Sequence, residues 1–106
     1  MDTNYISSIV KILENPIKIY SNKSIYVTKF RVQFPQYRNK MIINVSCWGK
    51  LGENVLNSYK INDYIIIEGY LSFRDTIELY SRKKVEITAL RIYPFILDSD
   101  FRSLEV

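Results

Sequence analysis

The sequence predicts an all-β domain, a closed barrel of five strands with a short α-helix between strands 3 and 4. Residues 25–34 include the clearest alternation of apolar and polar side chains, which is typical of a half-buried strand. Residues 51–60 instead space leucine, valine and tyrosine at helical intervals. Residues 64–74 are apolar, β-branched and of strand length. The chain therefore places one helix between strands.

The first strand is expected over residues 4–13. Its alternation is imperfect around Ser7 and Ser8, which indicates a bulge or a strong bend of the kind that small barrels need. Pro16 then interrupts the strand because proline has no N–H to donate to a neighbouring strand. Residues 17–20 are expected to continue in extended form.

The second strand is predicted over residues 25–34 and the third over residues 41–48. In the second, Phe30 and Phe34 face inward, whereas Lys29 and Arg31 face outward. In the third, Trp48 has the same parity as the polar residues Asn44 and Ser46, which means that the three side chains point to the same side of the strand. We therefore expect Trp48 to lie outside the core.

The helix is predicted over residues 51–60, after a turn at Gly49 that needs no Cβ. The dipeptide at 62–63 ends it, and the fourth strand follows over residues 64–74. Phe73 is expected in the core, and Gly69 is expected to permit close backbone approach. A last strand or hairpin spans residues 77–92. A helix that plugs one end of a five-stranded barrel in this way is typical of the OB-fold.

With 106 residues the chain is expected to form one domain, residues 1–97, followed by a short C-terminal tail, residues 98–106. Of its 15 basic and 11 acidic residues, 14 and 8 lie within residues 1–97, which leaves that part at +6. A basic body favours an anionic partner, although ordinary solubility would also explain the charge. The abundance of isoleucine, tyrosine, lysine and asparagine indicates an A/T-rich genome, such as that of an organelle or an A/T-rich bacterium.

Several functions are excluded by what the sequence lacks. It has no histidine and one cysteine, Cys47, which excludes histidine acid–base catalysis, cysteine zinc clusters and an internal disulfide. Its acids are scattered and its three glycines form no phosphate-binding loop. We expect no catalytic residues, no metal and no cofactor. Neither a secretory signal nor a membrane span is recognisable, so a soluble, intracellular protein is expected.

The segment W-G-K-L-G-E-N-V-L at 48–56, followed by I-E-G-Y-L at 67–71, resembles the bacterial and organellar single-stranded DNA-binding proteins. N-P-I-K-I-Y at 15–20 and E-I-T-A at 86–89 resemble further segments of that family, in the same order. The resemblance covers residues 4–95 and suits a plastid-encoded member. It implies that Trp48 stacks on a base, but Ile42 and Thr76 stand where many relatives have tryptophan. The family's acidic, Phe-ended tail tip is absent.

Binding a single strand requires aromatic side chains for base stacking and cations for the phosphates, together on one face. Trp48 is the strongest stacking candidate; a subunit contact or burial under the helix is the alternative. The candidate phosphate contacts, which could also be ordinary solvated surface, are Lys29, Arg31, Arg38, Arg74, Arg82, Lys83 and Lys84. The tyrosines that could stack beside them are Tyr37, Tyr70 and Tyr80.

These observations predict sequence-independent binding of single-stranded DNA in replication, recombination or repair, without catalysis. The family resemblance and the tyrosine content also predict a homo-oligomer, a dimer or tetramer, with replication proteins as further partners. One alternative is a primosome-type accessory barrel that acts mainly through protein partners, as the missing tryptophans and tail suggest. Another is a structural barrel subunit with no nucleic acid ligand.

Overall fold

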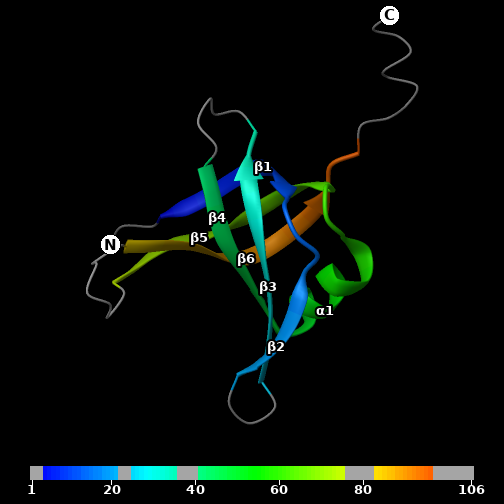
Figure 1. The fold of residues 1–106 in the computed structure, drawn as a ribbon, viewed down its shortest axis with the longest axis horizontal. Helices are drawn as coiled ribbons and strands as arrows, with labels where there is room; N and C mark the ends of the chain where they lie inside the picture. The colour runs from blue at the N-terminus through cyan, green and yellow to red at the C-terminus, as the bar shows by residue number, and fades with distance from the viewer. Residues whose placement is uncertain (1–3, 22–24, 36–40, 76–82, 97–106) are drawn as a thin grey trace, which may run out of the picture.

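The computed structural model describes residues 4–21, 25–35, 41–75 and 83–96; for residues 21, 73–75 and 83–84 it describes the backbone alone. The described elements are β1 (Tyr5–Ile12), β2 (Ile17–Ser21), β3 (Ile25–Phe34), β4 (Met41–Trp48), α1 (Gly49–Ser58), β5 (Tyr64–Asp75) and β6 (Lys83–Pro94). Figure 1 shows the strands wrapped around one core with α1 beside them. The predicted second and third strands coincide with β3 and β4.

The strands form one closed barrel. Their order in the sheet is β1-β5-β6-β4-β3-β2, and a further pairing joins the end of β1 to β3, with Lys11 opposite Gln33. The β4–β6 pairing is parallel and the others are antiparallel. After the interruption at residues 13–16, β2 continues along β3 from Ile17, opposite Lys29. Counted together, β1 and β2 are one strand, which confirms the predicted five-stranded OB-fold barrel.

Of the two irregularities expected in the first strand, a bulge or a bend, only the bend is compatible with the structure. β1 pairs with β5 in unbroken register from Tyr5 to Lys11, and Ser8 simply takes an inward-facing position. The prediction of a bulge around Ser8 is therefore wrong. The prediction of a bend agrees with the change of pairing partner along β1, from β5 to β3. The bulge occurs in the β5–β6 pairing, between Glu68 and Gly69. The sequence showed only a glycine at that point.

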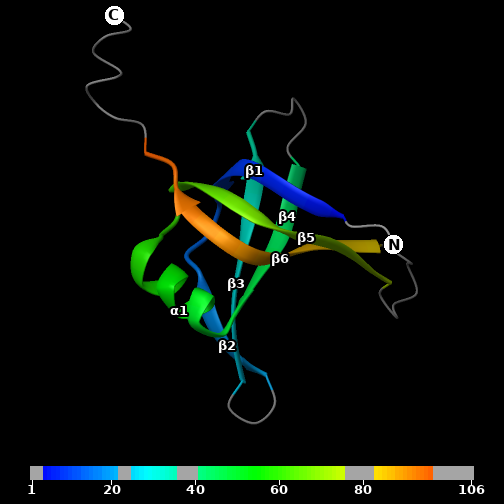
Figure 2. The same cartoon turned by 180° about the vertical axis from the view of Figure 1, so that it is seen from behind.

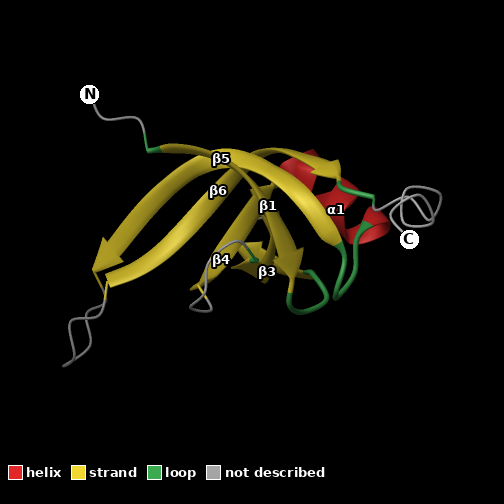
Figure 3. Cartoon of the chain, turned by 90° about the horizontal axis from the view of Figure 1, so that it is seen from above, coloured by secondary structure: helices red, strands yellow, loops and turns green. Residues whose placement is uncertain are grey.

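The helix closes one end of the barrel, as expected, although α1 spans residues 49–58 rather than 51–60. It starts at Gly49, whose φ of +60° lies in the left-handed region that favours glycine. Val55 is buried, and Leu51 and Tyr59 pack against the core. Figures 2 and 3 show α1 at one end, away from the far end of the β5–β6 hairpin.

A tight turn after α1 joins the helix to the first strand. The helix ends earlier than predicted, at Ser58, because Tyr59 is already extended. Asn62, which was expected to end it, lies in the following turn with φ +76°, which asparagine tolerates better than most residues. The Asn62 N–H donates to the Ile12 carbonyl at 2.8 Å, and the Ile12 N–H donates to the Asp63 carbonyl at 2.9 Å. These bonds fix the end of β1 against the start of β5.

Among the described residues, the buried core is aliphatic with two phenylalanine rings. Four isoleucines are fully buried, namely Ile12, Ile65, Ile67 and Ile87. Burying each such side chain contributes about 1.5–3 kcal/mol. Phe30 and Phe34 are also buried, as their inward parity predicted, whereas the Phe73 side chain lies outside the described part of the chain.

The thiol of Cys47 is expected to be unreactive in the folded protein. The residue is fully buried, and desolvation raises the pKa of its thiol to about 12. At pH 8 roughly one molecule in ten thousand then carries the reactive thiolate. A disulfide reagent should therefore modify Cys47 only as fast as the protein unfolds, and at once in concentrated denaturant. Rapid modification of the native protein would contradict this burial.

Candidate nucleic-acid interface

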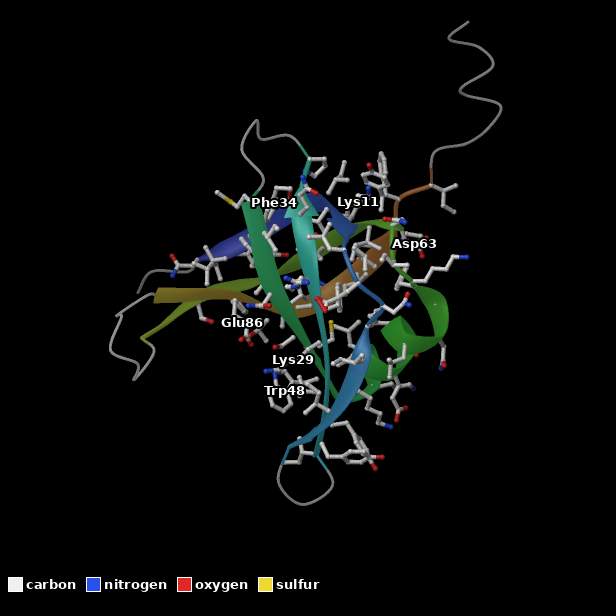
Figure 4. All side chains as sticks on the ribbon, viewed as in Figure 1. Lys11, Lys29, Phe34, Trp48, Asp63 and Glu86 are labelled. Carbon is white, nitrogen blue, oxygen red and sulfur yellow. The ribbon has the colours of Figure 1, made fainter. Side chains whose placement is uncertain are left out.

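The register of β3 and β4 places aromatic and charged side chains on one outer surface. Trp48 lies opposite Val27, Ser46 opposite Lys29 and Asn44 opposite Arg31. Residues directly opposite in antiparallel strands share a face. We call this the outer β3–β4 face and define it by Lys29, Arg31, Asn44, Ser46 and Trp48. Figure 4 labels Trp48 and Lys29 on this face, where Lys29 is opposite Ser46, two residues before Trp48 in β4.

Trp48 lies outside the core, as its parity predicted. The residue is 44% exposed, at the last position of β4 before α1 begins. Val27 has the same outward parity but is only 3% exposed, since it lies between Ile19 and Trp48 in the register. The indole therefore has an apolar neighbour on one side and solvent on the other, which suits stacking on a base.

The two cations of this face differ in their surroundings. Lys29 is half-buried, and within the described residues it makes no ion pair. Arg31 is exposed, and its Nε–H donates to Oε1 of Glu14 at 2.5 Å. Both side chains of this pair remain substantially in solvent, 56% for Arg31 and 38% for Glu14. A pair so exposed contributes at most about 1 kcal/mol to stability.

Ser46 differs from the other outward positions of β4 because it is covered. It is 1% exposed, and its hydroxyl donates to Oε1 of Glu86 at 2.5 Å. Glu86 belongs to β6, which runs parallel to β4 at this point. An acidic side chain thus borders the outer β3–β4 face, as Figure 4 shows.

An open hollow of about 190 Å³ lies on the outer β3–β4 face, where the β1–β2 connection approaches β3. Its lining residues are Glu14, Ile17, Lys29, Phe30, Arg31 and Asn44. Sequence reasoning found both cations of this lining, Lys29 and Arg31, but missed Glu14 and Asn44. No local signal marks them, because their contribution depends on strands that are distant in sequence.

Tyr70 is exposed but lies away from Trp48. Its ring meets that of Tyr5 edge-on, with centroids 5.8 Å apart and planes at 74°. Tyr70 is opposite Thr88 of β6, which in turn is opposite Ser46 of β4, so two strand spacings separate Tyr70 from β4. The structure therefore groups Lys29, Arg31 and Trp48 but not Tyr70.

The remaining candidates are only partly placed. The backbone register sets Arg74 opposite Lys84 in the β5–β6 hairpin, with Lys83 adjacent. The side chains of these three residues are outside the described part of the chain. Four further candidates also lie outside it, namely Tyr37, Arg38, Tyr80 and Arg82, as does the proposed tail at residues 98–106.

In the described residues, no group of three or more Asp, Glu, Cys or His side chains is arranged to hold a metal ion. No helix within the described residues has both the length and the apolar character needed to cross a membrane. Within the described residues, the barrel and the helix that plugs one end define an OB-fold, an architecture that in many proteins binds single-stranded nucleic acid.

Comparison with known proteins identifies the family. No family model matches the chain, but it is 39% identical over 104 residues to the "Putative single-stranded DNA-binding protein ycf41" of Trieres chinensis, covering 91% of this chain and 92% of that protein. It is also 35% identical over 71 residues to the "Thylakoid-associated single-stranded DNA-binding protein slr1034" of a Synechocystis species, covering 62% of this chain and 55% of that protein. The chain belongs to the single-stranded DNA-binding protein (SSB) family.

Solved structures share the fold. The small single-stranded DNA-binding protein of Streptomyces coelicolor superposes with a TM-score of 0.79 at 18% identity, covering 91% of this chain and 97% of that one. The SSB domain of a Synechococcus protein gives 0.74 at 23% identity, covering 88% and 97%. The family consists of DNA-binding proteins, not enzymes, which confirms the prediction that this chain is not an enzyme.

Proposed function

We propose that this protein binds single-stranded DNA without strong sequence preference, stacking a base on Trp48 and holding phosphates with cations of the outer β3–β4 face. The observation that carries the proposal is the position of Trp48, 44% exposed at the end of β4 and near Lys29, which makes no ion pair with the residues that the structure describes. Base–aromatic stacking tolerates any sequence because every base has a flat face. Membership of the SSB family supports the same ligand.

The bound DNA strand should extend beyond the outer β3–β4 face to two basic segments of the chain, the end of the β5–β6 hairpin and the loop after β3. Arg74 and Lys84 lie opposite each other, so the β5–β6 hairpin concentrates positive charge at its end. We propose that Arg74, Arg82, Lys83 and Lys84 contact phosphates there. In the same way, Arg38 is proposed to bind phosphate in the loop after β3, with Tyr37, Tyr70 and Tyr80 as further stacking residues.

A titration with dT strands of several lengths tests this function. Trp48 is the only tryptophan, so its fluorescence should be quenched as a base stacks on it. The affinity should fall steeply with salt, because each neutralised phosphate releases counterions. Absence of both quenching and binding at low salt would rule out the proposed function.

A second candidate is an accessory barrel that acts mainly through protein partners. Ile42, at an outward position of β4, is 49% exposed. An exposed aliphatic side chain suits a protein contact better than a base. This candidate predicts weak or no binding to dT together with capture of a replication protein.

The outer surface of β1, β5 and β6 is proposed to join copies of the chain into a dimer or tetramer. Ile9 and Tyr93 lie on either side of Ile66 in the register and are 36% and 45% exposed. Glu68 and Arg91 pair beside them at 3.6 Å. An apolar centre with a charged border is typical of a subunit contact.

Replacing Ile66 with lysine is expected to convert the oligomer to monomers, because the contact would then bury an unpaired charge. Sedimentation equilibrium measures the mass of each species. Ile25→Lys is the matched control, since Ile25 is exposed on β3 away from this surface and should leave the mass unchanged. An unchanged mass for Ile66→Lys would place the contact elsewhere.

We further propose that the protein serves DNA replication, recombination or repair in a plastid or bacterial cytoplasm. The amino-acid composition, which is typical of an A/T-rich genome, supports this location. A relative described as thylakoid-associated supports it as well. Replication proteins would be its partners.

A further inference from the structure

The hollow on the outer β3–β4 face combines charges in a way that suits an anion. Lys29 and Arg31 reach it from β3, Asn44 reaches it from β4, and Glu14 borders it from the β1–β2 connection. Two cations and one carboxylate leave the hollow with a net charge of about +1 at neutral pH. The amide of Asn44 adds a further hydrogen-bond donor. Phe30 also lines the hollow, but it is 3% exposed and belongs to the core, so it offers no open aromatic face. The set therefore matches one phosphate group better than a base, which would need such a face.

The guanidinium of Arg31 is hydrogen-bonded through its Nε–H, and within the described residues its terminal amino groups are not. Its Nε–H bonds to Glu14, and no other hydrogen bond of its side chain is seen among the described residues. The terminal amino groups therefore remain available. A guanidinium presents them as a planar fork that matches two oxygens of a phosphate.

Glu14 is itself fixed in place through its two neighbours in the chain. The Leu13 N–H donates to the carbonyl of Arg31 at 2.9 Å, and the side-chain oxygen of Asn15 accepts the Ile61 N–H at 2.8 Å. The backbone on each side of Glu14 is thus attached to β3 and to the turn after α1. A carboxylate held in this way restricts the rotamers of the arginine that it contacts.

We propose that this hollow is a phosphate-binding subsite in which Arg31, with Lys29, donates to one phosphate of the strand and Glu14 is a positioning residue for Arg31. The proposal rests on the proposed function. Ordering a long side chain before binding lowers the entropy lost on binding. The negative charge of Glu14 opposes the phosphate, but solvent and salt screen charges on an exposed face. Positioning therefore outweighs repulsion here.

Salt-dependent titrations of the full-length protein with labelled dT strands test the subsite. Arg31→Gln should lower the affinity roughly fivefold and reduce the salt slope by about 0.7, the value for one phosphate contact on a single strand. Glu14→Ala should lower the affinity roughly threefold, although it makes the protein more positive. Glu14→Gln should stay within about twofold of the wild type, because its amide oxygen can still accept the Nε–H.

The matched control is Glu53→Ala. Glu53 lies on α1, where it pairs with Lys18 at 3.7 Å, so its removal adds the same charge away from the hollow. This variant should bind dT as tightly as the wild type or more tightly. If Glu14→Ala also binds as tightly as Glu53→Ala, Glu14 merely competes with phosphate and the positioning role is wrong. An unchanged salt slope for Arg31→Gln would mean that no phosphate binds in the hollow.

Failure of the subsite is distinguishable from failure of the proposed function. Binding of dT by the wild type with no change in Arg31→Gln refutes the hollow alone. If the wild type does not bind dT, inorganic phosphate at low ionic strength still tests the hollow through the nuclear magnetic resonance signal of the Arg31 Nε–H. A signal that shifts in the wild type but is lost or unmoved in Glu14→Ala supports the subsite. A signal that phosphate does not shift in the wild type overturns it.

Discussion

Replacing Gly69 with alanine is expected to lower the free energy of unfolding by about 3 kcal/mol or more. A Cβ at this position would lie 2.2 Å from the carbonyl oxygen of Thr88 and 3.0 Å from the Cα of Ala89. Both atoms belong to the backbone of β6, so no side-chain rotation relieves the overlap. The two strands would have to separate at the bulge, and their pairing is part of the barrel closure. Urea denaturation monitored by circular dichroism measures the loss.

Gly49→Ala is the matched control for this prediction. Gly49 has φ +60°, and a Cβ built there meets nothing within 4 Å. Only the left-handed backbone opposes alanine at this position, at a cost of roughly 1–2 kcal/mol. Equal losses for the two variants would mean that the bulge widens easily, and would refute the steric argument for Gly69.

The strands could be predicted where burial alternates residue by residue. β3 and β4 have the predicted bounds because one face of each strand packs on the core and the other meets solvent. β1 was harder to interpret, since Ser8 occupies an inward position that the pattern assigns to an apolar residue. The helix begins at Gly49 because a single residue with positive φ redirects the chain out of β4. Periodicity contains no information on that dihedral angle.

The site could be predicted only as far as parity determines it. Parity places Lys29, Arg31 and Trp48 outside the core, and the structure has them there. It does not reveal that Glu14, 17 residues before Arg31 in the sequence, contacts that arginine. It also cannot show that Glu86 covers Ser46 from a strand 40 residues further along the chain. Both contacts depend on the registers of β1, β3, β4 and β6 in the closed barrel.

Replacing Trp48 with alanine is expected to weaken binding of dT by about 1–3 kcal/mol, or roughly 5- to 150-fold, because one base loses its stacking surface. The fold should be little affected, since the residue is 44% exposed and the core lies on the other side of β4. Fluorescence anisotropy of a labelled dT strand measures the affinity, because the variant has no tryptophan of its own. Trp48→Phe should retain most of the affinity.

Tyr20→Ala provides the control for Trp48. Tyr20 is more exposed, at 68%, and its ring packs on Tyr26 with centroids 4.9 Å apart. In β2 and β3 these two tyrosines have the parity opposite to Ile19 and Val27, so they face away from the outer β3–β4 face. Loss of an exposed aromatic ring there should leave the affinity unchanged. If both variants bind like the wild type, Trp48 does not stack on a base, and the cations alone would have to hold the strand. If both lose affinity equally, the DNA passes over both surfaces of the β2–β3 hairpin.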